Sequence, residues 1–246
     1  MEENVTEKMT QEEPKLSFVS KFGLIFTNPT KLFTNLAQYP TWIGPTLVIL
    51  VISVASGYLM KDLGIQAQKE KILKSERIPE ERKELILERM EEGSGSQLQT
   101  ILMPLSIVVF VFGSIALVAG LYLFTGNFIL GGTADYKSML AVYAWGSLVS
   151  IPEAIIKIPL ALAKKSIHVY TSLAILFDPS ESETVLFKIA NAVDVFAIWR
   201  VILWAIGFGI VYKFTRGKSY VAIGAWYVIW IVVSIGFSNL FAGFIG

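Results

Sequence analysis

Four ionisable residues lie within stretches of sequence that are otherwise apolar enough to cross a membrane. They are Glu153, Lys157, Asp194 and Arg200. A charge at the depth of the bilayer core costs roughly 2.5–3.5 kcal/mol even on lenient insertion scales, so such residues are rare and usually have a partner or a ligand. They can form internal ion pairs that fix helix register, or line a polar cavity for ions, lipid headgroups or small solutes. The two cations can also extend toward the interface.

The positions of these four charges along two consecutive apolar runs predict which of them pair. Glu153 and Lys157 are four residues apart, so they share one face of a helix and can pair locally. If the two runs are antiparallel helices, a rise of about 1.5 Å per residue puts Glu153 and Arg200 at similar depth, roughly 13 Å and 10 Å below the outer boundary. By the same measure Lys157 lies at roughly 7 Å and Asp194 at roughly 2 Å. We therefore expect the pairs Glu153–Arg200 and Lys157–Asp194 to join neighbouring helices near Pro152.

The composition indicates a membrane protein and offers little for catalysis. Hydrophobic residues make up 54% of the chain and charged residues 17%, whereas soluble domains carry about 25% charged residues. A net charge of +1 implies no nucleic-acid partner, and the lack of cysteine excludes disulfides and thiolate metal sites. His168 is the only histidine, and no phosphate-binding loop, zinc motif or nucleotide fingerprint occurs. We predict no catalytic centre, metal or cofactor, and interpret Ser147 and Ser150 as small helix-packing residues.

Five apolar runs reach the length of about 20 residues that a spanning helix needs. We expect the spans at residues 41–60, 101–124, 139–162, 193–212 and 220–241. The second run continues to about residue 130 and should break near Gly126, while a long helix should begin near Thr184. Long apolar runs form helices in lipid because a helix closes its own backbone hydrogen bonds. The sequence thus predicts an all-α integral membrane protein, with residues 41–246 forming a bundle of five transmembrane helices.

Residues 15–40, which precede the first span, have the pattern of helices that lie in the membrane interface. Phe18, Phe22, Ile25 and Phe26 fall on one face of a helix, and Asn28-Pro29 starts a second helix that carries Leu32, Phe33 and Leu36. Such helices bury their apolar face at the level of the headgroups and do not cross the bilayer. Residues 1–14 are polar and are expected to form a tail.

Residues 61–100, between the first two spans, hold eight basic and nine acidic side chains and should lie outside the membrane. Residues 78–81, Ile-Pro-Glu-Glu, start a helix, because proline and acidic residues both favour the first turn. An apolar stripe follows at Leu85, Ile86 and Met90, and residues 93–96, Gly-Ser-Gly-Ser, should end the helix. This amphipathic helix covers the mouth of the bundle or binds a partner; the sequence leaves both open.

Basic residues in short loops predict the orientation. The loop between the last two spans holds Lys213, Arg216 and Lys218 without an acidic residue, and the segment before the first span holds four lysines. Because cytoplasmic loops are rich in lysine and arginine, we expect the N terminus and this loop in the cytoplasm. With five spans, the C terminus and residues 61–100 then lie on the external side.

Short motifs spread over most of the chain occur in an order that resembles one membrane family. They are Asn28-Pro29-Thr30-Lys31-Leu32-Phe33, Tyr39-Pro40 and Pro45; Gly131-Gly132, Asp135-Tyr136, Tyr143-Ala144 and Pro152; and Asp194, Phe196, Trp199 and Gly207. The chain resembles the Yip family, membrane proteins that interact with Ypt/Rab GTPases, and their prokaryotic relatives. The resemblance implies a five-helix bundle with a cytoplasmic N-terminal segment, and for eukaryotic members a role in vesicle traffic. The family-motif candidates that follow from it are Pro29, Phe33, Asp135, Tyr136, Pro152 and Trp199.

Two departures indicate a prokaryotic relative in the cell membrane. The segment before the first span is short, and neither Lys157 nor Arg200 matches the family pattern. The leading hypothesis is a non-enzymatic membrane protein of the Yip class that acts as an organiser or adaptor, with a membrane protein or a second copy as partner. The alternative is a small transporter, channel or lipid-handling protein that uses a polar site around Glu153 and Arg200. A cavity that reaches Glu153 favours the alternative, and a dry, paired core favours the organiser.

Overall fold

The computed structural model describes residues 14–75, 78–93 and 97–244, and this part of the chain is helical without a β-strand. Five of its helical segments are long and apolar enough to span a membrane, so the predicted all-α class and five-span bundle are confirmed. The polar tail up to residue 13, the helix stop at residues 94–96 and the end of the chain at residues 245–246 lie outside the described residues.

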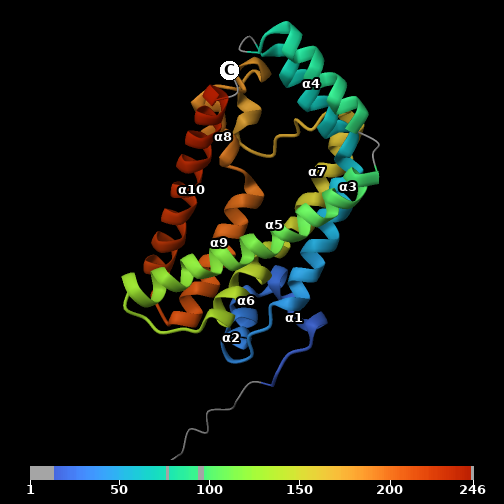
Figure 1. The fold of residues 1–246 in the computed structure, drawn as a ribbon. Coiled ribbons are helices and arrows are strands. Elements are labelled where there is room, and N and C mark those ends of the chain that lie inside the picture. Colours follow the sequence, from blue (N-terminus) through green and yellow to red (C-terminus); the bar gives the residue numbers. More distant parts are fainter. Residues whose placement is uncertain (1–13, 76–77, 94–96, 245–246) are drawn as a thin grey trace, which may run out of the picture.

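The five spans differ in length and regularity (Figure 1). They are α3 (Ile43–Lys74), α5 (Gln97–Phe124) with the π-helix η1 (Thr125–Ile129), α6 (Tyr136–Gly146) with the 3₁₀-helix η2 (Ser147–Val149) and α7 (Ser150–Lys164), α9 (Val195–Tyr212) and α10 (Arg216–Phe244). The first span was expected to end at residue 60. Its helix instead continues without a break to Lys74, through about a third of the charged segment that was expected to lie outside the membrane.

Shorter helices precede and connect the spans. They are α1 (Phe18–Thr27), α2 (Pro29–Gln38), α4 (Glu80–Gly93), η3 (Leu173–Leu176), η4 (Pro179–Glu181) and α8 (Val185–Ala192). The expectation of one long helix from Thr184 is wrong. Thr184 does cap a helix, since its Oγ1 accepts a bond from the Phe187 N–H, but that helix ends at Ala192. Asp194 then starts α9 by accepting bonds from the N–H groups of Phe196 and Ala197.

One end of the bundle is densely packed. In Figure 1, α1, α2, α6 and the C-terminal end of α9 gather at this end, and α4 and α8 lie at the other. The apolar residues of α2 are at most 1% exposed, because α2 packs across α9 and α6. They are Leu32, Phe33 and Leu36. Trp145 of α6 and Phe208 of α9 are also fully buried here. α2 is therefore part of the folded core of the bundle, while α1 buries only Lys21 and Ile25.

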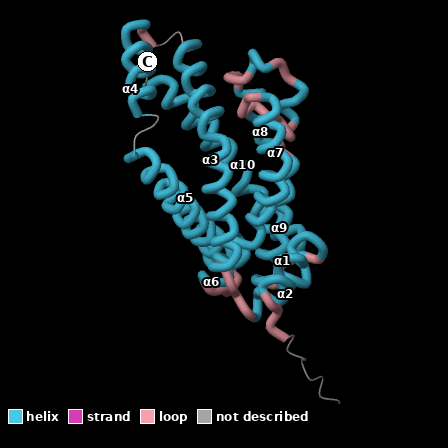
Figure 2. Tube along the Cα trace, turned by 90° about the vertical axis from the view of Figure 1, so that its right-hand side faces the viewer, coloured by secondary structure: helices cyan, strands magenta, loops and turns pink. Residues whose placement is uncertain are grey.

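Toward the other end the third and fourth spans separate. α6 and η2 contact α9, as expected for antiparallel neighbours, whereas α7 packs on α3 and α9 packs on α10. Figure 1 shows the resulting division of the helices, with α3 and α7 in one group and α8, α9 and α10 in the other. In Figure 2, which views the molecule from the side of α3 and α7, the two groups overlap. Pro152 lies at the point of separation. It has no N–H for the carbonyl of Leu148, so the regular helical ladder is interrupted there and the chain passes through η2.

The second span ends in a π-helix that is fixed by the last two spans. A Cβ at Gly126 would lie 2.0 Å from the ring of Tyr212, so only glycine allows this approach. The Tyr212 hydroxyl donates to Asn127 Oδ1 at 2.8 Å, and Trp226 Nε1 of α10 donates to Thr125 Oγ1 at 2.7 Å. The expected break near Gly126 is thus present as a change of helix type.

Candidate functional site

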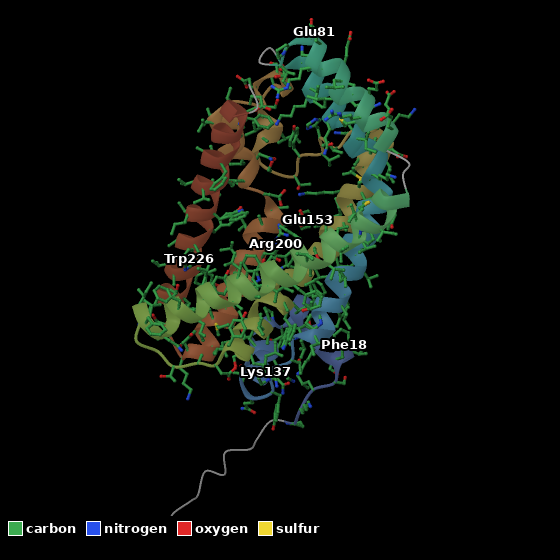
Figure 3. The ribbon with its side chains drawn as sticks, in the orientation of Figure 1. Phe18, Glu81, Lys137, Glu153, Arg200 and Trp226 are labelled. Atoms are coloured by element: carbon green, nitrogen blue, oxygen red, sulfur yellow. The ribbon has the colours of Figure 1, made fainter. Side chains whose placement is uncertain are left out.

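Two polar stripes face each other where α7 and α9 separate. One runs along η2 and α7 through Ser147, Ser150, Glu153 and Lys157, and the other along the start of α9 through Asp194, Ala197, Arg200 and Trp204. Both have the spacing of three and four residues that keeps side chains on one face of a helix. Figure 3 shows Glu153 and Arg200 between these two groups of helices.

Three ion pairs connect the four charges that the sequence singled out. Lys157 Nζ lies 2.7 Å from Glu153 Oε1 and 3.1 Å from Asp194 Oδ2, and Arg200 Nη1 lies 3.2 Å from Glu153 Oε2. The pairs predicted from helix depth, Glu153–Arg200 and Lys157–Asp194, are confirmed, as is the local pair on α7. The charges form a chain in the order Asp194, Lys157, Glu153, Arg200.

The two ends of this chain are not equivalent. Asp194 at one end also accepts bonds from the hydroxyl of Thr171 and from two N–H groups of the first turn of α9. A helix N-terminus carries partial positive charge, which further stabilises this carboxylate. Arg200 at the other end makes a single ion pair within the described part of the chain. Positive charge is therefore less fully compensated at Arg200 than negative charge is at Asp194.

The cluster reaches a cavity and is not sealed in the core. The exposed fraction of the four side chains is 19% for Glu153, 28% for Lys157, 11% for Asp194 and 29% for Arg200. A cavity of about 290 Å³, here called the charged cavity, contains all four in its wall. The rest of its lining comes from the loop after α7 and from α8, α9 and α10: Val169, Asn191, Ala192, Ala197, Tyr227, Trp230, Ile231 and Ser234.

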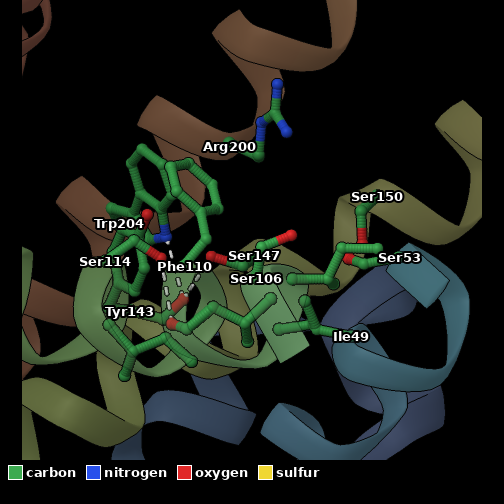
Figure 4. Close-up of a pocket in the computed structure, with 13 residues that line it drawn as sticks. Ile49, Ser53, Ser106, Phe110, Ser114, Tyr143, Ser147, Ser150, Arg200 and Trp204 are labelled. Carbon is green, nitrogen blue, oxygen red and sulfur yellow. Dashed lines mark hydrogen bonds between the residues drawn. The ribbon is translucent and has the colours of Figure 1, made fainter. Parts of the chain in front are cut away.

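A second, larger cavity of about 660 Å³ adjoins the first at Arg200, and Figure 4 shows its lining. We call it the serine-lined cavity. Its polar residues are Ser53, Ser106, Ser114, Ser147, Ser150, Tyr143 and Arg200, and its apolar residues are Ile49, Ile107, Phe110, Val111, Ile115 and Trp204. The interpretation of Ser147 and Ser150 as packing residues missed this role, because sequence alone does not show which face of a helix a small residue occupies.

Aromatic side chains form the floor of the serine-lined cavity. The rings of Tyr143 and Trp204 stack with centroids 4.8 Å apart, and Tyr122 packs edge-on against both. Trp204 Nε1 donates to the carbonyl oxygen of Tyr143 at 3.1 Å, which ties α9 to α6 at this level. Beyond this floor lies the densely packed end of the bundle. The cavity is therefore closed toward α1 and α2.

Three of the family-motif candidates organise helix starts and breaks. Pro29 is the first residue of α2, where its missing N–H costs nothing, and Asn28 caps the helix by accepting a bond from the Lys31 N–H. Asp135 caps α6 through the N–H and hydroxyl of Ser138, at 2.7 Å and 3.1 Å. Pro152 lies at the interruption between α6 and α7.

The other three candidates join neighbouring helices. Tyr136 donates its hydroxyl to the carbonyl oxygen of Ala116 in α5 at 2.8 Å. Phe33 of α2 fills the space beside Gly207 of α9, where an added Cβ would lie 2.8 Å from its ring. Trp199 meets Phe26 of α1 edge to face at 6.0 Å. None of the six lines either cavity, so in the described structure they position the helices that carry the charged residues.

The remaining titratable chemistry is sparse. His168 is exposed in the loop after α7, where its Nδ1 lies 3.1 Å from the hydroxyl of Tyr170. Among the described residues no three His, Asp or Glu side chains come together in a way that could hold a metal ion. Partial burial raises the pKa of Tyr170 above its ordinary value.

The order of the motifs and the five-span arrangement agree with a match over almost the whole chain. The sequence model of the Yip1 domain matches residues 22–238. The chain belongs to the Yip1-domain family. The matched region contains the five candidate spans, the lining of both cavities and the six motif candidates. No curated protein and no solved structure matches the chain.

Proposed function

We propose that this Yip-family protein is a non-enzymatic lipid-handling protein, which holds the polar headgroup of a membrane lipid in the charged cavity. One observation carries the proposal: the four intramembrane charges are paired in a chain, yet all of them line a cavity. A purely structural clamp is best served by close packing around its ion pairs, since each partly hydrated charge gives up part of the Coulomb attraction. An accessible, pre-organised set of opposite charges instead suits a polar ligand.

The shape of the site favours a lipid-binding protein over an open channel. An open channel needs a polar path through the bundle, but the stacked rings of Tyr143 and Trp204 close the serine-lined cavity toward α1 and α2. Ile155 and Ile156 of α7 and Ile198 of α9, which are exposed near the separation of the two helices, present apolar side chains to lipid. A lipid can therefore bring its headgroup to the charged residues while its chains stay in the bilayer.

The proposed location is a prokaryotic cell membrane with the N terminus in the cytoplasm and the C terminus external. Support comes from the distribution of basic residues, because α1, α2 and the start of α10 lie at the same end of the bundle in Figure 1. Lys137 lies at this end as well (Figure 3). By the positive-inside rule this end faces the cytoplasm, and the cavities open toward the external half.

A role as organiser or adaptor is the second candidate, and the same basic end supports it. The side chains of Lys15, Lys31, Lys137, Lys213 and Arg216 are exposed there. An exposed positive surface at a membrane face attracts anionic lipid headgroups or an acidic surface of a membrane-protein partner or a second copy. Crosslinking with mass spectrometry in native membranes tests this candidate, since a partner should crosslink through these lysines.

Native mass spectrometry of the detergent-purified protein tests the lipid-handling proposal. We expect the parent protein to retain lipid, and the double variant Glu153→Gln/Arg200→Gln, which keeps the net charge, to lose it. The matched control is Arg82→Gln/Glu81→Gln, which changes two exposed residues of α4. Equal retention by the parent and the cavity variant would contradict the proposal, as would a parent protein that carries no lipid.

A further inference from the structure

The unequal ends of the ion-pair chain indicate the sign of the ligand group that fits. The four charges sum to zero, but Asp194 is also stabilised by Thr171 and by the first turn of α9. Lys157 lies between two carboxylates, at 2.7 Å from Glu153 and 3.1 Å from Asp194. The guanidinium of Arg200 has one described ion pair for its five N–H donors. The remaining positive potential is therefore at Arg200, which selects an anionic group.

Arg200 lies in the wall of both cavities, and the serine-lined cavity also contains Ser150, whose hydroxyl has no partner among the described residues. Ser150 is three residues before Glu153 on α7, and its side chain lines the serine-lined cavity together with Arg200. Ser150 Oγ is buried and has no hydrogen-bond partner among the described residues. A buried hydroxyl without a partner is destabilising, so an acceptor that enters the cavity would relieve this penalty.

The other serines of the cavity are mostly engaged. Ser106, Ser114 and Ser147 donate to backbone carbonyl oxygens of their own helices at 2.7–2.9 Å. These three serines make the wall polar without adding free donors, and among the described residues Ser150 has the hydroxyl that is buried without a partner. Figure 4 shows Ser147 and Ser150 on one side of the cavity and Arg200 of α9 on another.

We propose that the phosphate diester of a membrane phospholipid binds where the serine-lined cavity meets the charged cavity at Arg200, with the Arg200 guanidinium and the Ser150 hydroxyl as its donors. A guanidinium and a hydroxyl match the oxygen acceptors of a phosphate, and arginine is suited to bind two of them at once. The apolar part of the cavity, formed by Ile49, Ile107, Phe110, Val111 and Ile115, accepts the adjoining part of the lipid. This inference rests on the proposed lipid-handling function and names the headgroup chemistry.

The test compares two lipids with the same acyl chains, one with a phosphate and one without. Phosphatidylglycerol and monogalactosyl diacylglycerol are titrated separately into the detergent-purified full chain, and the bound fractions are measured by native mass spectrometry. We expect the parent protein to prefer phosphatidylglycerol. Ser150→Ala should weaken phosphatidylglycerol binding at least about tenfold, because a hydrogen bond to a charged group is lost. It should leave galactolipid binding unchanged, and Ser20→Ala on the exposed side of α1 is the matched control.

Arg200→Gln adds a second readout, since it should abolish the preference between the two lipids, whereas Arg82→Gln should preserve it. Equal binding of both lipids by the parent protein, with no effect of Ser150→Ala, would overturn the phosphate assignment and leave the lipid-handling function standing. Binding of neither lipid would contradict both. Inorganic phosphate serves as a third probe. If it binds as tightly as phosphatidylglycerol, the site takes a free anion and the phospholipid assignment is wrong.

Discussion

The indole of Trp204 stacks on the ring of Tyr143 at an angle of 19° and donates a hydrogen bond to the carbonyl oxygen of the same residue. This relationship joins the fourth span to the third immediately below the cavities. It depends on Gly146, where an added Cβ would lie 2.4 Å from Trp204 Cδ1. The floor of the serine-lined cavity is therefore set by one glycine and two aromatic side chains.

Gly146→Ala should destabilise the protein, because the added methyl group would lie 2.4 Å from Trp204 Cδ1 and the indole could not keep its place on Tyr143. Overpacking of a dense core costs typically about 1–3 kcal/mol. Thermal unfolding in detergent measures the loss. Gly113→Ala in α5 is the control, since nothing lies within 4 Å of an added Cβ there and alanine favours a helix. Equal unfolding temperatures for the two variants would show that the indole moves without cost.

The Glu153–Arg200 pair should behave as a coupled unit. Glu153→Gln leaves Arg200 without its described partner, and Arg200→Gln leaves the second oxygen of Glu153 unpaired. Removing one charge should therefore cost more than removing both, by about 1–3 kcal/mol of coupling energy. A double-mutant cycle read as unfolding temperature in detergent gives this number. Additive losses would mean that the two side chains do not interact in the folded protein.

Lys21 provides a pH-dependent prediction. It is 2% exposed and donates to the carbonyl oxygen of Tyr39 and to Thr41 Oγ1, and no carboxylate pairs with it among the described residues. Burial, with a smaller contribution from the charge of Lys15, lowers the pKa of Lys21. In the unfolded chain Lys21 has the ordinary pKa of about 10.4, and in the folded protein its pKa is lower. The unfolded chain therefore keeps the Lys21 proton up to a higher pH than the folded protein does. Stability must rise with pH between the two values.

The measurement for Lys21 is the difference in unfolding temperature between the parent protein and Lys21→Met. This difference should grow in favour of the parent protein as the pH rises toward the ordinary lysine pKa of about 10.4, because the buried Lys21 of the folded protein loses its proton before the exposed Lys21 of the unfolded chain. The matched control is Lys31→Met, whose side chain is exposed on α2. A difference that is constant over this range, or that shrinks, would contradict the assignment.

The proposed orientation predicts opposite accessibility at two points of the chain. A tag inserted between Arg216 and Gly217 should be protected from external protease, because it lies at the basic end with α1 and α2. A reporter fused after Gly246, beyond the described residues, should be external. Both sites on the same side would contradict the orientation.

Much of the fold follows from features that are local in the sequence. The five apolar runs, the helix starts at Asn28-Pro29 and Thr184, and the irregularity near Gly126 depend on neighbouring residues only. The two cross-helix ion pairs were also predictable, since charge and depth along two antiparallel helices leave few combinations. What the sequence did not indicate depends on how helices lie against one another. The separation of α7 from α9, and hence both cavities, arises because α7 packs on α3.

The free hydroxyl of Ser150 illustrates the limit of local reasoning. Serine in a transmembrane helix usually packs or bonds to the carbonyl one turn earlier, as Ser147 does with Tyr143. Ser150 differs because it lies just after the 3₁₀ turn and beside Pro152, where the ladder is irregular. No property of the residue itself signals this, so a site built on it appears only in three dimensions.

The contact between Phe33 and Gly207 constrains how the chain matures. Phe33 belongs to the second helix to leave the ribosome, yet the glycine that receives its ring lies in the fourth span. During synthesis Phe33 must wait for this contact until four further segments, the last of them α9, have entered the bilayer. The apolar face that ends in the core thus begins as a temporary attachment to the lipid surface. A nascent chain arrested before residue 195 would display this face to the insertion machinery. Release of the fourth span, α9, would let Phe33 pack beside Gly207.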